Sequence, residues 1–326
     1  MDKHHDHKGA KVERKLHLSW SFVNELGALT GLVLICIIIS LLTPRFLLPS
    51  NLINILVQIS VIATIAVGMT FVILTGGIDL SVGSIVALGG LVLGILMIDH
   101  HLPVWAAVIL VLLMGTAIGC LNGFLITRLT LPPFIVTLGM MSIVRGAAYS
   151  ITGGQPMYTF PEEFLTIAQG HVFSIPIPII IMVVVYGIAY YLLRYTKLGR
   201  YSYSIGGSES ASILSGINVK AYKTAVYGIL GFLCAVSASL LTARLDSAVP
   251  VAGDGYELDA IAAVVIGGTS MMGGEGKITG TLIGALIMGV VSNGLNLLTV
   301  PSGNQRMIKG AIIIIAVLID VLRKRK

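Results

Sequence analysis

The sequence predicts an all-α membrane protein that crosses the bilayer many times. Of its 326 residues, 56% are hydrophobic and only 11% are charged, and the mean hydropathy is +0.94. Soluble domains carry about a quarter charged residues, so most of the surface of this protein cannot face water. The apolar residues also gather in runs of about 20, the length that a helix needs to cross a bilayer.

Ten apolar runs are candidate spans, although the eighth and the tenth are short for the range of about 17–25 residues that spanning helices need. These runs are Leu26–Leu42, Leu52–Leu74, Leu80–Ile98, Leu102–Ile126, Leu131–Tyr149, Val172–Leu193, Ala221–Leu241, Leu258–Met272, Ile278–Leu297 and Met307–Leu322. The sequence therefore predicts about ten transmembrane helices in a membrane domain over residues 26–326. A polar, basic leader over residues 1–25 precedes this domain.

The basic residues predict how these spans are oriented. If the amino terminus is cytoplasmic and the spans alternate, sixteen of the 21 Lys and Arg residues lie on the cytoplasmic side and four lie outside, with Arg145 inside a span. Membrane proteins carry such an excess of Lys and Arg on the cytoplasmic side, so both termini are expected there. The four histidines of the leader can bind a metal ion or belong to a plain tail, and we favour the tail.

Two apolar stretches are broken by paired glycines. Gly76-Gly77 interrupts the stretch Gly68–Gly90, and Gly267-Gly268 follows an apolar run in the last third of the chain. In each case a further glycine lies six residues after the second of the pair, which suggests a duplicated half. Irregular backbone at membrane depth is tolerated where protein buries it or where it lines a water-filled cavity, and broken helices often mark a transport pathway. A tight turn at the membrane surface explains the glycines equally well.

Polar residues near these breaks or inside the spans are candidate pathway residues, because polar groups at membrane depth usually face a bundle interior or a cavity. An Asn there can also simply tie two helices together, and an Asp or a Ser at a helix start can be a cap. In the predicted topology both breaks lie at cytoplasmic helix ends and face each other. The predicted pathway or gate residues are Gly76, Gly77, Asp79, Ser81, Gly267, Gly268, Asn293 and Asn296.

One cytoplasmic loop and one outer segment are candidate docking surfaces. The inner loop, about residues 194–223, is basic and rich in glycine, and it contains a predicted short helix with Ser208 as N-cap and Gly216 after its end. This loop is either a docking element or a solvated connector. The outer segment Ser247–Asp259 combines a turn with carboxylates at a helix start, where they also favour the helix dipole. The predicted contact residues in this segment are Asp254, Glu257 and Asp259.

The sequence lacks the common signatures of catalysis. It has no phosphate-binding loop of the GxxxxGK type, no HExxH or CxxC motif, and no plausible Ser-His-Asp arrangement. The three cysteines lie inside apolar runs, where they are expected to be small buried hydrophobes. We therefore predict that the chain is not an enzyme and has no catalytic residue, no cofactor and no metal site of its own.

Four stretches resemble the ribose-type permeases of bacterial ATP-binding-cassette (ABC) sugar importers. They are GMTFVILTGGIDLSVGSIVALGG (68–90), LGRYSYSIGGSESASILSGINV (198–219), GYELDAIAAVVIGGTSMMGGEGKITGTLIGALIMG (255–289) and NGLNLL (293–298). The similarity runs in order from about Phe46 to the last span. One departure is Ser208, where the pattern leads us to expect Asn after the paired glycines.

The resemblance implies a permease subunit of a bacterial cytoplasmic membrane that moves ribose or a related monosaccharide. Its implied partners are a second permease copy or a close paralogue, a cytoplasmic ATPase with two fused cassettes that binds ATP and Mg²⁺, and an extracytoplasmic sugar-binding protein. It implies no nucleic acid. The implied fold resembles the permeases of vitamin B12-type importers, with an inverted internal repeat. The residues expected to couple to the ATPase are Gly199, Arg200, Gly206, Gly207, Ser210, Ala211, Ile213, Leu214, Ser215 and Gly216.

Two alternatives from other classes remain. An ion-coupled secondary sugar carrier would need paired carboxylates within the membrane, whereas here Asp79, Glu257, Asp259 and Asp320 all lie near the ends of spans. A membrane scaffold without transport activity would need neither polar residues in its spans nor broken helices.

Overall fold

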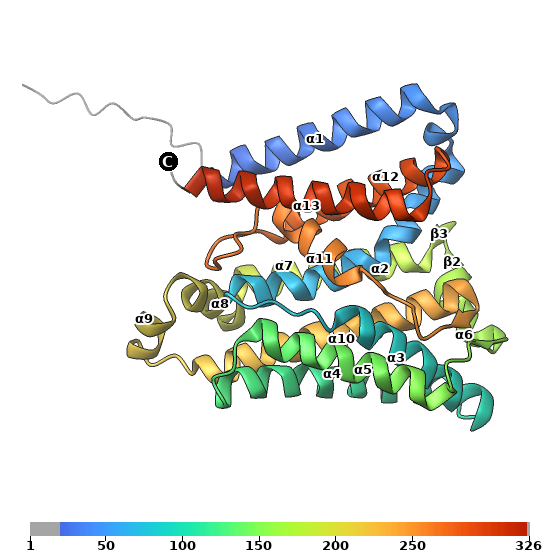
Figure 1. The fold of residues 1–326 in the computed structure, drawn as a ribbon, viewed down its shortest axis with the longest axis horizontal. Coiled ribbons are helices and arrows are strands. Elements are labelled where there is room, and N and C mark those ends of the chain that lie inside the picture. The colour runs from blue at the N-terminus through green and yellow to red at the C-terminus, as the bar shows by residue number, and fades with distance from the viewer. Residues whose placement is uncertain (1–19, 325–326) are drawn as a thin grey trace, which may run out of the picture.

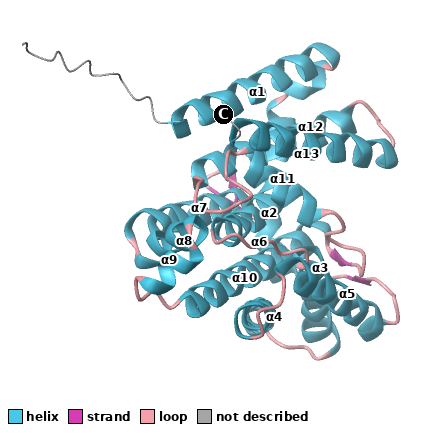
Figure 2. Ribbon diagram, turned by 60° about the vertical axis from the view of Figure 1, so that its left-hand side comes forward, coloured by secondary structure: helices cyan, strands magenta, loops and turns pink. Residues whose placement is uncertain are grey.

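The computed structural model describes residues 20–324, which are mostly helical (Figures 1 and 2). The long helices are α1 (Trp20–Leu42), α2 (Pro49–Leu74), α3 (Val82–Gly94), α4 (Val104–Arg128), α5 (Pro133–Thr152), α7 (Ile177–Tyr195), α10 (Val219–Leu245), α12 (Ile278–Leu297) and α13 (Ser302–Lys324). Shorter helices are η1 (Pro44–Leu47), η2 (Ile95–Asp99), α6 (Glu162–Gln169), α8 (Lys197–Gly207), α9 (Glu209–Leu214) and α11 (Tyr256–Ile266).

Within residues 20–324, four two-residue strands make two small antiparallel pairs. They are β1 (Met157–Tyr158), β2 (His171–Val172), β3 (Ile175–Pro176) and β4 (Ser247–Ala248). β1 pairs with β4 and β2 pairs with β3. Together with α6, these strands lie at the end of the bundle opposite to α8 and α9 (Figure 1).

Seven helices within the described residues are long and apolar enough to cross a membrane, which agrees with the predicted multi-pass helical protein. They are Pro49–Leu74, Val82–Asp99, Val104–Arg128, Pro133–Thr152, Ile177–Tyr195, Val219–Leu245 and Ile278–Leu297. The other three predicted spans differ in length from their helices. The apolar part of α1 is Gly27–Leu42, α11 ends at Ile266 rather than Met272, and α13 starts at Ser302 rather than Met307.

The predicted leader is only partly described. Residues 1–19 lie outside the described residues, while residues 20–25 already belong to α1. The boundary predicted at residue 26 therefore falls inside a helix.

Helix α2 occupies the middle of the bundle. It contacts α7, α10, α11 and α12. In its most apolar stretch of 18 residues, 78% of the residues are buried by the rest of the protein. Helices α4 and α10 pack against each other at close range, because Gly115 and Gly119 on α4 lie directly against the backbone of α10. Small residues that let helix backbones approach closely are a common means of packing in membranes.

The inner loop contains more structure than the sequence predicted. Ser208 caps α9 as expected, since its Oγ accepts a hydrogen bond from the amide of Ala211 at 3.2 Å. Gly216, with φ +79°, follows the end of α9. The preceding residues, however, form the 11-residue helix α8, which buries Ser202 and Ile205 against the bundle. The loop is therefore a pair of short helices at one end of the bundle (Figure 1).

Candidate functional site

The first glycine break lies between α2 and α3, where residues 75–81 are not helical. Helix α10 holds this segment, because the Tyr227 hydroxyl donates a hydrogen bond to the carbonyl of Ile78 at 3.2 Å. A Cβ on Gly77 would lie 2.5 Å from the same hydroxyl oxygen. A side chain at Gly77 would therefore displace Tyr227 or the break itself.

Asp79, inside this break, has a buried carboxylate that three hydrogen bonds satisfy. Its Oδ1 accepts from the Ser81 amide at 2.8 Å and from the Ser81 hydroxyl at 2.6 Å. Its Oδ2 accepts from the amide of Asn122 on α4 at 3.2 Å. Asp79 is only 1% exposed, so in this chain it belongs to a buried polar cluster that joins the first break to α4.

The second glycine break lies between α11 and α12, over residues 267–277. Gly268 has φ +87°, a conformation that glycine adopts at little cost, and this ends α11 early. Within the break, the amide of Ser270 donates to the carbonyl of Glu275 at 2.9 Å and folds the segment into a compact turn. Lys277 then precedes the first residue of α12.

The two breaks contact each other, although about 200 residues separate them in the sequence. The amide of Gly274 donates a hydrogen bond to the carbonyl of Leu74 at 3.0 Å. A Cβ on Gly273 would lie 2.9 Å from the amide nitrogen of Gly76. We call residues 74–77 and 270–276 together the break junction. This contact agrees with the expectation that the breaks face each other.

Helix α8 lies directly on the break junction. A Cβ on Gly206 would overlap the carbonyl oxygen of Leu74 and the amide nitrogen of Gly274, one atom from each half of the junction. One turn earlier, the Tyr203 hydroxyl donates to the carbonyl of Gly276 at 2.8 Å. Any displacement of α8 must therefore move, or separate from, both breaks at once.

Helix α9 follows α8 and carries exposed apolar side chains. Leu214 is 89% exposed and Ile213 is 57% exposed. The Glu209 carboxylate pairs with the Lys223 ammonium on α10 at 2.5 Å, which fixes α9 to the bundle. Of the other predicted coupling residues, Gly199 is buried against α7. Those that are exposed are Arg200, Gly207, Ser210, Ala211, Ser215 and Gly216.

Asn293 and Asn296 lie far from the break junction. Asn293 exchanges two hydrogen bonds with Asn51, at 3.0 and 2.9 Å, near the start of α2, whereas the junction lies at the end of α2. Asn296 accepts a hydrogen bond from Gln305 on α13 at 2.9 Å. Both amides thus tie helices together within this chain, and the structure does not bring them near the other predicted pathway residues.

The predicted outer contact residues are largely engaged within the chain. Asp254 pairs with Arg306 and Asp259 pairs with Lys309, each at 2.8 Å, and both cations come from α13. Arg145, on α5, donates to the backbone carbonyls of Pro250 and Ala252 and holds the same segment.

A family model described as "Branched-chain amino acid transport system / permease component" matches residues 51–317. The chain belongs to this family. The ribose import permease protein RbsC of Haemophilus influenzae is 46% identical over 92% of the chain and 94% of its own length. The ribose import permease protein RbsC of Bacillus subtilis is 46% identical over 94% and 96%, and the D-allose transport system permease protein AlsC of Escherichia coli is 40% identical over 92% and 93%. No solved structure gives a significant match.

These comparisons confirm the resemblance to ribose-type permeases that we inferred from four stretches of the sequence. The residues that the family model matches, 51–317, include both breaks and the α8–α9 segment.

Two residues of the permease site were missed at the sequence level. Asn122, which donates hydrogen bonds to Asp79 and Ser81, lies in the last third of the apolar α4. The same signal that selected other residues, a polar side chain inside a span, would have found it. Tyr203 carries no such signal, because its contact with Gly276 depends on how α8 meets a segment about 70 residues later.

One prediction separates the largely buried ion pair of Asp259 from the exposed ion pair of Asp254. Asp259→Asn is expected to lower the stability by about 3 kcal/mol, because it leaves Lys309 beside a buried site without its counter-ion. Asp254→Asn is the matched control and should change it by less than about 1 kcal/mol, since both partners of that ion pair are exposed. Thermal unfolding in detergent, followed by tryptophan fluorescence, measures the difference. Equal melting temperatures for the two variants would contradict the prediction.

Proposed function

We propose that this permease is the membrane-spanning subunit of an ATP-driven importer for ribose or a related monosaccharide. The observation that carries the proposal is 46% identity, over nearly the whole chain, to two proteins named as ribose import permeases. The relative named for D-allose transport, at 40% identity, supports a monosaccharide as the class of substrate.

We further propose that a cytoplasmic ATPase with two fused cassettes binds at α8 and α9. The sequence has no phosphate-binding loop of the GxxxxGK type, so ATP and Mg²⁺ would be held by that partner and the permease would need no cofactor or metal of its own. The exposed Leu214 and Ile213 supply an apolar docking surface. The contact of Gly206 with both breaks supplies a mechanical path from the ATPase to the pathway residues Gly76, Gly77, Gly267 and Gly268.

The proposed assembly contains two permease subunits, identical or closely related, in a bacterial cytoplasmic membrane. Each would have about ten transmembrane helices and an inverted repeat, as in vitamin B12-type permeases. The repeat is supported by two similar units, α2–break–α3 and α11–break–α12, that meet at the break junction. Arg128, Arg194 and Lys220 lie at the α8–α9 end of the bundle, which supports a cytoplasmic position for that end and for both termini.

At the opposite end, an extracytoplasmic sugar-binding protein would meet the segment that contains Asp254, Glu257 and Asp259. Asp254 has the exposure that such a contact requires, whereas the carboxylate of Asp259 is largely buried against Lys309. Glu257 is half-buried between them in the first turn of α11.

The test is reconstitution of the purified permease in lipid vesicles, alone and with the ATPase that copurifies from its native membrane. The permease alone should show no ATP hydrolysis and no concentrative uptake of labelled ribose. With the ATPase and the binding protein added, the vesicles should hydrolyse ATP and take up labelled ribose against its gradient. Uptake by the permease alone, driven by a proton or sodium gradient, would overturn the proposal and favour the secondary carrier.

A further inference from the structure

A short hairpin, in which β2 pairs with β3, lies directly before α7 in the chain. The amide of Ile177, the first residue of α7, donates a hydrogen bond to the carbonyl of Gly170 at 3.0 Å and closes the base of the hairpin. The hairpin is therefore held at the start of α7, at the end of the bundle opposite to α8 and α9 (Figure 1). We call residues 170–177 the β2–β3 hairpin.

The β2–β3 hairpin turns apolar side chains away from the protein. Residues directly opposite each other in a hairpin share a face, and successive residues along a strand alternate between the two faces. The pair that contains Pro176 has this proline buried, so the next pair, Val172 and Ile175, points outwards. Val172 is 45% exposed and Ile175 is 48% exposed. The outward face of an antiparallel pair in water is usually polar, and here it is apolar.

The tip of the hairpin also carries an apolar side chain, since Phe173 is 96% exposed. Phe173 and Ser174 form the two-residue turn with φ of +48° and +67°. Such turns favour Asn and Gly, and a bulky residue with positive φ is an outlier. Backbone strain of this kind is concentrated at functional positions. The combination of strain with nearly complete exposure indicates that the Phe173 ring has a contact outside this chain.

Helix α7 determines how deep the hairpin lies in a bilayer. The helix has 19 residues and is able to cross a membrane. Its length of about 28 Å is close to the hydrocarbon thickness of about 30 Å, so Ile177 lies at the edge of the hydrocarbon. The turn begins three residues before Ile177, which is about 10 Å of extended chain. The headgroup region extends for about 5–8 Å on each side, so the tip lies at headgroup depth or at its outer edge.

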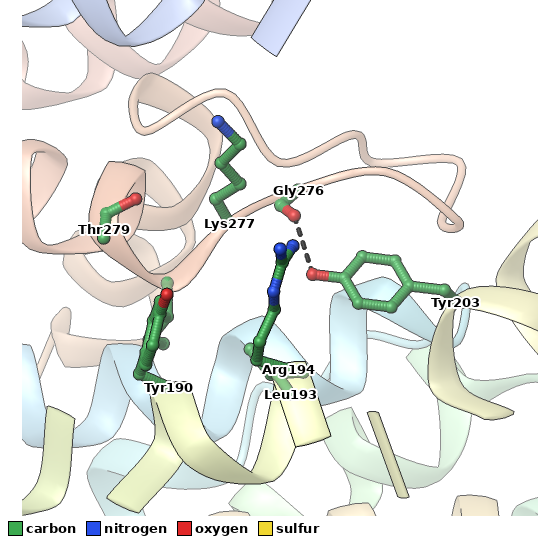
Figure 3. Close-up of a pocket in the computed structure, with 8 residues that line it drawn as sticks. Tyr190, Leu193, Arg194, Tyr203, Gly276, Lys277 and Thr279 are labelled. Atoms are coloured by element: carbon green, nitrogen blue, oxygen red, sulfur yellow. Dashed lines mark hydrogen bonds between the residues drawn. The ribbon is translucent and has the colours of Figure 1, made fainter. Parts of the chain in front are cut away.

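The two ends of α7 differ in the residues that fix a helix in a membrane. Its last two turns contain tyrosines and an arginine, which are types that anchor helices at the interface. They are Tyr190, Tyr191, Arg194 and Tyr195. Tyr190 and Arg194 rise from α7 close to the contact between Tyr203 and Gly276 (Figure 3). Residues 177–185, at the other end, include no aromatic or charged residue, and Phe173 is the nearest aromatic residue before them.

We propose that the β2–β3 hairpin is a membrane anchor that inserts Phe173, Val172 and Ile175 among the phospholipid headgroups at this end of the bundle. Residues 172–193 include no charged residue, and only 28% of the most apolar stretch of α7 is buried by the rest of the described chain. The apolar surface of the hairpin therefore continues that of a membrane-crossing helix. A binding protein that docks and dissociates would leave this surface in water during each cycle, which favours lipid as its partner.

The experiment is depth-dependent fluorescence quenching of Phe173→Trp in the full-length permease, with the two native tryptophans replaced by Trp20→Phe and Trp105→Phe. The protein is reconstituted in phosphatidylcholine vesicles whose acyl chains carry bromine either near the headgroup or near the chain end. We expect stronger quenching by bromine near the headgroup and little quenching by iodide present on both sides of the membrane. Glu163→Trp in the same background is the matched control, because Glu163 is exposed on α6 at the same end of the bundle. Its fluorescence should be quenched by iodide and not by brominated lipid.

A second variant tests the outward face of the hairpin. Val172→Thr/Ile175→Thr keeps β-branched side chains in both strands but makes this face polar, so it should increase iodide quenching of the tryptophan introduced at the tip. Iodide quenching of Phe173→Trp as strong as that of Glu163→Trp would overturn the proposal, because the tip would then lie in water. Protection from both quenchers, or protection from iodide only after the binding protein is added, would also overturn it, because protein would then cover the tip. Circular dichroism verifies that each variant keeps its helix content.

Discussion

Gly206→Val is expected to abolish ATP-driven sugar uptake while leaving the permease inserted in the membrane. The added Cβ overlaps the carbonyl of Leu74 and the amide of Gly274, which are backbone atoms and cannot rotate away. Overpacking at one site typically costs about 1–3 kcal/mol, so α8 should shift away from the break junction rather than the bundle unfold. The ATPase would still bind α9. However, α8 would no longer transmit the movement of the ATPase to the two breaks.

The measurement is uptake of labelled ribose into vesicles that contain the permease variant, the ATPase and the binding protein, with ATP hydrolysis followed in parallel. We expect uptake to fall at least a hundredfold while hydrolysis continues, which is the signature of uncoupling. Gly207→Val is the matched control, because it changes the neighbouring residue of the same helix, where a Cβ meets nothing within 4 Å. If both variants transport equally well, α8 does not act through Gly206.

The sequence was sufficient to locate both breaks but not their contact. Paired glycines that interrupt an apolar run are a local signal, and the structure has irregular backbone at both positions. The hydrogen bond between Gly274 and Leu74 links residues 200 positions apart. Nothing in the local pattern of either segment specifies such a partner, so the break junction required the three-dimensional arrangement.

Local patterns were misleading where tertiary packing decides the conformation. The α8 segment is rich in Gly, Ser and Tyr, a composition that favours a loop, yet burial of Ser202 and Ile205 makes it a helix. The opposite error occurred after α11. Met271 and Met272 extend the apolar run, but Gly268 at φ +87° ends the helix, and Met272 is exposed.

The outer segment shows the same limit for charged residues. The sequence correctly placed Asp259 in the first turn of a helix, where carboxylates favour the dipole, and Asp254 in the turn before it. Their pairing with Arg306 and Lys309 depends on how α13 packs against α11, which charge patterning alone does not determine.

Leu214→Asp is expected to release the ATPase from an otherwise intact permease. Leu214 is 89% exposed at the end of α9, so an aspartate there is fully solvated and does not disturb the fold. In the assembled importer the same side chain is proposed to be buried in the ATPase. Losing the burial of one leucine costs about 1.5–3 kcal/mol, which corresponds to about 10- to 100-fold weaker binding, and placing a charge in an apolar groove adds to this loss.

Copurification of the ATPase with tagged permease from detergent-solubilised membranes measures the effect, with thermal unfolding of the permease as the folding control. Leu214→Met is the conservative variant and should retain the ATPase, because it preserves an apolar side chain of similar volume. Glu209→Gln distinguishes binding of the ATPase by the apolar side chains of α9 from the ion pair that holds α9 in place. It weakens the ion pair that fixes α9 to Lys223 but leaves the apolar surface in place, so binding should fall much less than with Leu214→Asp. If Leu214→Asp copurifies with a full complement of ATPase, the docking surface lies elsewhere, and the contact of α8 with the break junction loses its proposed role in coupling.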